Sequence, residues 1–385
     1  MRCCWLLRCP RHKTVRMVVA KFMSLSVRIS VCLVVGVSAT ATSAIVQSQS
    51  QQDWYIIRTL SENASPNGIA IGPSGEIYIT SGKEQILRSD DATTFTAIAG
   101  LKHQLRIPVD PSYDPGPLFS GDGGPALDAY IDGPTGIAIG DDGTVYFTDS
   151  RNHRIRQILK NGTIETIAGT GEAGFGGDGG PAQSAKLNHP KGLSIDKIGN
   201  LYVADSGNNR IRMIQPKGRI LTVAGNGKGG YSGDGRFATK ASLRAPYGVC
   251  VDALGVIYIA DTGNLRIRKV DQSGIIRTIS GTGKKDINAE SGLATRARLF
   301  SPESVAVDAV GNIFITDWVN GVRRISPDGI IKTIAAEQIQ GGSDWGNGGP
   351  GTAKTLYSST IALVSNGSIY TNHRGQLMLL TPNPH

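Results

Sequence analysis

A polar pattern, Asp-x-x-Asn-x-Arg-Ile-Arg, recurs along the chain and contains groups that could bind a ligand. Carboxylates, amides and guanidinium groups from several copies could form a polar ring around a ligand. Alternatively, each Asp could hold its own turn by accepting bonds from backbone amides, with an Arg paired to it. Repetition favours this structural role, because a residue present in every copy usually does what each copy needs. The candidate ligand-binding residues are Asp149, Asn152, Arg154, Asp205, Asn208, Arg210, Asp261, Asn264 and Arg266, with a looser copy at Asp317, Asn320 and Arg323.

Glycine-rich loops precede the copies of this pattern. Gly-Asp-Gly-Gly stands at 121–124 and 177–180, and Gly-Asp-Gly-Arg at 233–236. Their amides could cradle an anion and their Asp could bind Ca²⁺. One carboxylate per loop is few for a calcium site, so a turn that packs one repeat on the next is the favoured interpretation. The Gly-x-Gly-x-x-Gly match at 169–174 is followed by another glycine-rich loop rather than a helix, which argues against dinucleotide binding.

No histidine or cysteine has the spacing of a catalytic or metal site. Outside the first 45 residues, the histidines are His103, His153, His189, His373 and His385. Histidines from different repeats could still converge on a common axis, so no cofactor is predicted, while Ca²⁺ and Zn²⁺ stay open. Cys250 lies within an apolar run, where a buried thiol acting as a small apolar group is expected rather than a nucleophile. We assign no catalytic residue.

An insertion at 101–119 breaks the symmetry of the repeats. It contains several prolines and four residues that could bind a ligand, which are His103, Arg106, Tyr113 and Asp114. Loops that depart from a scaffold can add specificity without disturbing it. A tolerated surface insertion is the equally weighted alternative.

The elements that position these residues are set by a repeat of 56 residues, which separates Pro134, Pro190, Pro246 and Pro302. Each repeat has four short runs rich in Val, Ile and Tyr, bounded by Gly and Asn, which predict four antiparallel strands. Only the Pro-Ala-x-x-Ala-x-Leu segments could form a helical turn. Such units cannot bury their apolar faces alone and must stack. The repeat therefore predicts an all-β propeller of four-stranded blades.

Two degenerate copies, starting at Pro66 and shortly before Ile361, bring the count to six blades. The last copy lacks an outermost strand, and residues 54–60 resemble the missing one. Pairing of 54–60 with 376–380 would close the ring and leave no long edge open.

The predicted order of strands, named A to D from the axis outward, makes the two faces unequal. Short A–B and C–D turns share one face, while the B–C turns and the long D–A connections share the other, called here the loop-rich face. Long irregular connections are usually functional or disordered. A ligand site is therefore expected on the loop-rich face.

The formal net charge of +9 does not indicate a nucleic-acid partner, because residues 1–45 hold seven Lys and Arg and no acidic residue. Residues 1–44, with Met23 as an alternative start, resemble a secretory signal peptide. Residues 45–52 form a polar linker, and 53–385 the propeller. We expect export to the periplasm or the cell exterior, with no transmembrane span after the signal is removed.

The segment 177–212 carries a family resemblance. Its Gly-Asp-Gly-Gly-Pro-Ala-x-x-Ala-x-Leu and later Ala-Asp-x-x-Asn-x-Arg-Ile-Arg resemble NHL repeats, as found in secreted bacterial NHL proteins and in teneurins. The resemblance implies a β-propeller, most often of six blades. Such propellers mostly serve as platforms for protein, glycan or other ligands. A few relatives, such as streptogramin lyases, are enzymes that use metal-bound or catalytic histidines, and no residue here matches those.

These observations predict an exported, non-catalytic binding or scaffold propeller that engages a protein, glycan or other ligand through its loop-rich face. The alternative is a metal-assisted lyase or hydrolase with a site at the mouth of the central channel. A purely structural domain of a larger assembly is a third possibility.

Overall fold

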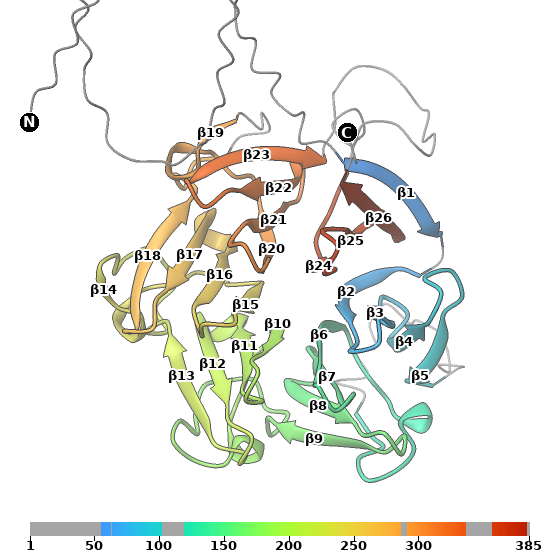
Figure 1. The fold of residues 1–385 in the computed structure, drawn as a ribbon. Helices are drawn as coiled ribbons and strands as arrows, with labels where there is room; N and C mark the ends of the chain where they lie inside the picture. The colour runs from blue at the N-terminus through green and yellow to red at the C-terminus, as the bar shows by residue number, and fades with distance from the viewer. Residues whose placement is uncertain (1–54, 63, 102–118, 286–290, 336–355, 383–385) are drawn as a thin grey trace, which may run out of the picture. The chain divides into compact units, whose positions relative to one another are not determined.

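The computed structural model describes residues 55–62, 64–101, 119–285, 291–335 and 356–382. All of them belong to one compact unit, Gln51–His385. Their strands form six antiparallel sheets arranged around a central axis, a six-bladed β-propeller (Figure 1). The predicted fold class is confirmed.

The strands follow one another outward in every blade. Blade 1 has β2 (Pro66–Ile71), β3 (Ile77–Ser81), β4 (Gln85–Ser89) and β5 (Thr96–Ala99); blade 2 has β6 (Pro134–Ile139), β7 (Val145–Asp149), β8 (Arg154–Ile158) and β9 (Ile164–Ala168). Blade 3 has β10 (Pro190–Ile195), β11 (Leu201–Asp205), β12 (Arg210–Ile214) and β13 (Ile220–Ala224); blade 4 has β15 (Val249–Val251), β16 (Ile257–Asp261), β17 (Arg266–Val270) and β18 (Ile275–Ser280). Blade 5 has β20 (Pro302–Val307), β21 (Ile313–Asp317), β22 (Gly321–Ile325) and β23 (Ile330–Ala335); blade 6 has β24 (Ile361–Leu363), β25 (Ile369–His373) and β26 (Gln376–Pro382).

The ring closes as predicted. The outermost strand of blade 6 is β1 (Tyr55–Ser61), from the start of the propeller, and it pairs antiparallel with β26, for example Ile57 with Leu380. Figure 1 shows β1 beside β26. Backbone hydrogen bonds between the two ends of the chain therefore hold the ring together.

The hydrophobic core lies between neighbouring blades. One cluster combines Tyr202 and Ile211 of blade 3 with Ile259 and Val270 of blade 4, and comparable clusters join the other blades. Strand β11 is buried along its whole length, because both of its faces pack on adjacent blades. A single blade could not cover these side chains, which explains why the units must stack.

The D–A connections add a fifth edge element that the sequence analysis did not predict. The two-residue strands β14 (Arg236–Phe237) and β19 (Gly292–Leu293) pair with β18 and β23 of the following blade. Isolated bridges at Pro125 and Pro181 do the same for blades 2 and 3. Single 3₁₀ turns follow, at Ala126–Asp128, Ala182–Ser184, Ala238–Lys240 and Ala294–Arg296. The predicted helical turns and the packing of the Gly-Asp-Gly loops on the next blade are thus confirmed. The prediction that no other segment forms a helical turn was wrong, because 3₁₀ turns also occur in two B–C turns, at Ser206–Asn208 and Thr262–Asn264.

Candidate binding site on the loop-rich face

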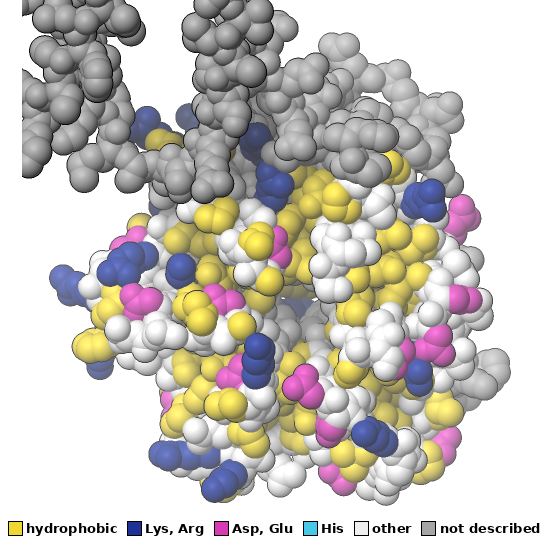
Figure 2. All heavy atoms as spheres, in the orientation of Figure 1, with side chains coloured by type: hydrophobic (Ala, Val, Ile, Leu, Met, Phe, Trp, Pro, Cys, Tyr) yellow, Lys and Arg dark blue, Asp and Glu magenta, His cyan; other side chains and the backbone are white. Residues whose placement is uncertain are grey.

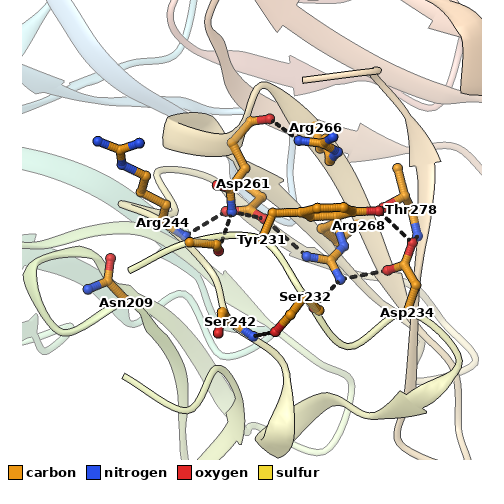
Figure 3. Close-up of polar contacts among 12 residues, drawn as sticks. Asn209, Tyr231, Ser232, Asp234, Ser242, Arg244, Asp261, Arg266, Arg268 and Thr278 are labelled. Atoms are coloured by element: carbon orange, nitrogen blue, oxygen red, sulfur yellow. Dashed lines mark hydrogen bonds and ion pairs between the residues drawn. The ribbon is translucent and has the colours of Figure 1, made fainter. Parts of the chain in front are cut away.

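The second Arg of each polar pattern is the centre of a buried ionic cluster. In blade 4, Arg268 is fully buried, and its guanidinium lies 3.2 Å from the Asp261 carboxylate and 2.6 Å from that of Asp234 (Figure 3). It also donates to the Ser232 carbonyl at 3.1 Å. Asp234 comes from the Gly-Asp-Gly-Arg loop, so the cluster ties that loop to the blade that follows it.

The first Arg of the pattern is stacked under an aromatic ring. The guanidinium carbon of Arg266 lies 3.7 Å from the centroid of Tyr231, beside Arg268 (Figure 3). Its nitrogens donate to the carbonyls of Asn264 and Thr282 at 2.7 and 2.8 Å. Gly283 has φ +81°, and a Cβ atom there would lie 2.2 Å from this guanidinium, so another residue would strain the backbone and displace Arg266. The Gly-x-Gly repeats therefore have a structural explanation.

Blades 2 and 3 repeat this arrangement. Arg156 pairs with Asp122 at 2.8 Å and Asp149 at 3.5 Å, and Arg212 pairs with Asp178 at 2.8 Å and Asp205 at 3.2 Å. Phe119 and Phe175 stack on Arg154 and Arg210.

Each Asp carboxylate also accepts bonds from its Asn neighbour and from one backbone amide, at Asp132, Asn188 or Arg244. That amide belongs to the incoming D–A connection, whereas the sequence analysis placed it in the turn next to the Asp. Burial raises the pKa of Asp149 to about 6, although the bonds from Asn152 and the Asp132 amide and the charge of Arg156 oppose the shift. The structural interpretation of the pattern is confirmed, and contact of these residues with a ligand stays a prediction.

Blades 1 and 6 lack both members of the ion pair. By strand register, Ser81 and Leu87 replace the Asp and the buried Arg in blade 1. His373 and Met378 replace them in blade 6, and His373 Nδ1 accepts the Tyr357 amide at 2.9 Å. Blade 5 keeps Asp317 and Arg323, both buried.

The other candidate residues fall in two groups. His153 and His189 contact each other, with centroids 4.6 Å apart, and the His189 amide donates to His153 Nδ1. Asn209 and Ala245 make the same bond one repeat later, so the two histidines occupy positions that have a structural role in the repeat. His103, Arg106, Tyr113 and Asp114 lie outside the described residues and stay predictions. Within the described ranges, no group of three or more His, Cys, Asp or Glu is placed to hold a metal ion.

A cavity of about 260 Å³ occupies the central channel, and Figure 2 shows the surface hollowed at the centre of the ring. The inner strands line it with apolar side chains such as Leu193, Val249 and Val305. Each inner strand begins at the loop-rich face, because a D–A connection precedes it. The second residue of each inner segment, which follows Pro in five blades, stands at that mouth. These six residues, called here the mouth ring, are Asn67, Thr135, Lys191, Tyr247, Glu303 and Ser359.

Half of the mouth ring is engaged in bonds within the protein. Asn67 Nδ2 donates to the Pro134 carbonyl at 3.1 Å, and Thr135 Oγ1 bonds with Ser150 Oγ at 2.6 Å. The hydroxyl of Ser359 accepts from Asn372 Nδ2 at 2.8 Å. The Asn67 bond joins blades 1 and 2, whereas the bonds of Thr135 and Ser359 lie within blades 2 and 6.

The other half consists of Lys191, Tyr247 and Glu303, from three consecutive blades. Lys191 Nζ lies 5.5 Å from the centroid of the Tyr247 ring. Among the described residues, the Lys191 ammonium and the Tyr247 hydroxyl make no hydrogen bond or ion pair, and the Glu303 carboxyl accepts only a 3.5 Å bond from Ser301. Polar groups that are partly withdrawn from water usually have partners, so this trio differs from the Arg clusters.

Partial burial shifts all three pKa values toward the neutral forms. Burial raises the pKa of Glu303 to about 7, with Asp317 adding to the shift and Lys191 opposing it. Burial lowers the pKa of Lys191, helped by the nearby charge of Arg151. The pKa of Tyr247 is raised to about 12 by burial, and that of Cys250, which also lines the channel, to about 12. Tyr247, Glu303 and Cys250 line the cavity, whereas Lys191 is not among its lining residues and lies beside the Tyr247 ring. Perturbed titratable groups in a cavity are typical of functional sites.

The mouth ring was not predicted from the sequence, although the sequence contains a signal for it. The residue after each Pro differs in every copy, while the residues around it are largely repeated. Repetition drew attention to the scaffold residues instead.

The known proteins most informative for this chain share its repeat. The family model described as the Teneurin NHL domain matches residues 114–175, 171–232 and 228–289. Human teneurin-1 is 28% identical over 288 residues, and human NHL repeat-containing protein 2 is 33% identical over 151 residues. Residues 114–289 of this chain are NHL repeats. Its propeller is of the teneurin-like NHL type.

The NHL relatives are much longer proteins. The matched regions cover 70% of this chain but 10% of teneurin-1, and 36% of this chain but 20% of NHL repeat-containing protein 2. A solved structure titled streptogramin B lyase has a TM-score of 0.51 and 17% identity, over 86% of this chain and 98% of that one. At this identity, the likeness concerns the fold alone. In the described part of this NHL protein, no helix is long and apolar enough to cross a membrane.

Proposed function

We propose that this NHL protein is an exported, non-catalytic binding propeller that engages a ligand through its loop-rich face. The observation that supports this most is the half of the mouth ring that has almost no hydrogen-bond partners among the described residues. Lys191, Tyr247 and Glu303 replace one another at equivalent positions of three blades, and their polar groups are almost without partners inside the protein. Such groups cost stability, and proteins retain them where a ligand completes them.

The opposite face offers a competing surface that the test must separate. The A–B turns of blades 3, 4 and 5 end in the apolar residues Ile198, Leu254 and Val310, which are 76, 70 and 74% exposed. Exposed apolar side chains on adjacent blades can dock a partner.

Hydrogen–deuterium exchange distinguishes the two faces. The purified protein is exposed to cellotriose, maltotriose, chitotriose and a set of short extended peptides. We expect slower exchange at the starts of the inner strands, around 190–192, 246–248 and 302–304, with at least one of these probes. Protection confined to the A–B turns, around 198, 254 and 310, or no protection by any probe, would contradict the proposal.

Export is proposed from the leader at 1–44, and amino-terminal sequencing tests it. When the gene is expressed in a bacterium with a secretory pathway, the protein outside the cytoplasm should start close to residue 45. An uncleaved amino terminus in a cytoplasmic product would refute export.

A lyase or hydrolase is the second candidate, and Glu303 is the observation in its favour. A buried carboxyl with a pKa of about 7 is suited to general acid–base catalysis. NMR spectra of each probe after prolonged incubation decide between the two functions. Unchanged probes support binding, whereas a product that the Glu303→Gln variant fails to form would support catalysis.

A further inference from the structure

We infer that Lys191, Tyr247 and Glu303 form a binding site for one neutral sugar unit, either free or at the end of a glycan. The inference rests on the proposed function of the loop-rich face as a binding surface. It adds the chemical class of the ligand and the residues that contact it.

Hydrogen bonding differs between the two halves of the mouth ring. Asn67 bonds to the next blade, and Thr135 and Ser359 bond to other side chains of their own blades. Lys191 and Tyr247 make no such bond among the described residues, and Glu303 makes one long bond. A ligand at this half of the ring must therefore provide both hydrogen-bond acceptors, for the ammonium and the phenol, and a donor, for the carboxylate.

The second argument is the charge of the trio. It contains one ammonium and one carboxyl, and no ion pair among the described residues joins Lys191 to Glu303. A charged ligand would pair with one of these groups and repel the other. A hydroxyl group both donates and accepts, so adjacent hydroxyls of one sugar can bond to Glu303 and Lys191 together.

The third argument is the size and lining of the cavity. Its volume of about 260 Å³ lies just below the usual range of ligand pockets, about 300–1,000 Å³, and suits a single small ring. Apolar side chains of the inner strands, among them Leu193, Val249 and Val305, lie deeper in the channel. Tyr247 and Glu303 line the same cavity, and Lys191 lies beside the Tyr247 ring, so apolar and polar groups can contact one sugar together.

Isothermal titration calorimetry tests the inference on the purified protein. The probes are glucose, galactose, mannose, N-acetylglucosamine and N-acetylgalactosamine, with cellotriose, maltotriose and chitotriose to separate free sugars from chain ends. Glucuronate and glucosamine serve as charged counterparts. We expect saturable binding of at least one neutral sugar, and binding at least 10-fold weaker for the charged counterpart.

Three variants locate the site. Glu303→Gln and Lys191→Met should each weaken binding at least 10-fold, and Tyr247→Phe about 3-fold, because it removes only the hydroxyl. The matched controls are Asp141→Asn and Lys217→Met, two exposed residues of turns on the opposite face, which should leave binding unchanged. Thermal melts establish that every variant is folded.

The outcomes separate this inference from the proposed function. Failure of all neutral sugars to bind, tighter binding of a charged counterpart, or unchanged binding by Glu303→Gln and Lys191→Met overturns the sugar site. If the exchange experiment still shows peptide protection at the inner-strand starts, the loop-rich face remains a binding surface. If it shows no protection there, both ideas fail.

Discussion

The Asp–Arg clusters and the mouth ring lie at the same end of the blades, yet they treat polar groups in opposite ways. Each cluster repeats the same residues and saturates them, as with Arg212, which is fully buried and paired with both Asp178 and Asp205. The mouth ring changes its residue in every blade and leaves Lys191 and Tyr247 without hydrogen bonds among the described residues. In this propeller, repetition marks the scaffold, and its loss on an otherwise repeated backbone marks the candidate site.

Removing a buried Arg should have the largest effect on stability. Arg212→Met leaves Asp205 buried without its cationic partner, which should lower the free energy of unfolding by about 3–5 kcal/mol. Urea denaturation followed by circular dichroism measures this loss. The mouth variant Lys191→Met should change stability by no more than about 1 kcal/mol, because it removes a desolvated charge that has no ion pair. Equal losses of stability in the two variants would contradict the proposed difference between the two regions.

Removing both partners should restore part of that loss. Blade 1 carries Ser81 and Leu87 in place of the pair, so Asp205→Ser combined with Arg212→Leu copies an arrangement that this fold already accepts. We expect the double variant to be more stable than Arg212→Leu alone by about 1–2 kcal/mol, because no buried carboxylate is left at 205. A double-mutant cycle from urea denaturation measures the coupling. Additive losses would show that the pair is not a unit.

The pH dependence of stability should distinguish the mouth from the clusters. Because the pKa of Glu303 is raised from 4.5 to about 7, the folded state binds more protons than the unfolded state between these values, and stability falls as the pH rises through them. Glu303→Gln removes this dependence. The variant should match the natural protein at pH 4 and exceed it by about 1–3 kcal/mol at pH 8, with Lys191 and Asp317 unchanged. A constant difference from pH 4 to 8 would refute the assignment.

The aromatic stack should give the smallest effect. Phe175 lies 3.5 Å from the guanidinium carbon of Arg210, so Phe175→Leu should lower the free energy of unfolding by about 0.5–1 kcal/mol. The control is Phe237→Leu, at a ring that is 62% exposed, where no measurable change is expected. A larger loss at 237 than at 175 would remove the stack from the scaffold.

Much of the fold could be predicted because the features that define the repeat lie within short stretches of the sequence. The 56-residue spacing, the glycine turns and the apolar runs gave the blades, and the unmatched strand at 54–60 gave the closure. The polar pattern was correctly interpreted as structural. Its partners were not predicted, because they come from other parts of the sequence. Asp178 accepts a bond from Arg212, and the Asn188 amide donates to Asp205.

The mouth ring could not be predicted from its residues considered one at a time. Lys191, Tyr247 and Glu303 are unremarkable along the chain, where 56 residues separate each from the next. They come together only because the six inner strands begin around one axis. The motifs that attracted attention were the ones the scaffold needs.

The sequence by itself determined the repeating unit, the number of blades and the strand that closes the ring, because hydrophobic period and turn residues act over a few neighbours. Only the tertiary structure decided which polar groups are saturated and which remain open at the channel mouth. Burial and partnership depend on residues that approach from other blades. For this reason, the scaffold could be predicted from the sequence, whereas the candidate site could be recognised only in the closed ring.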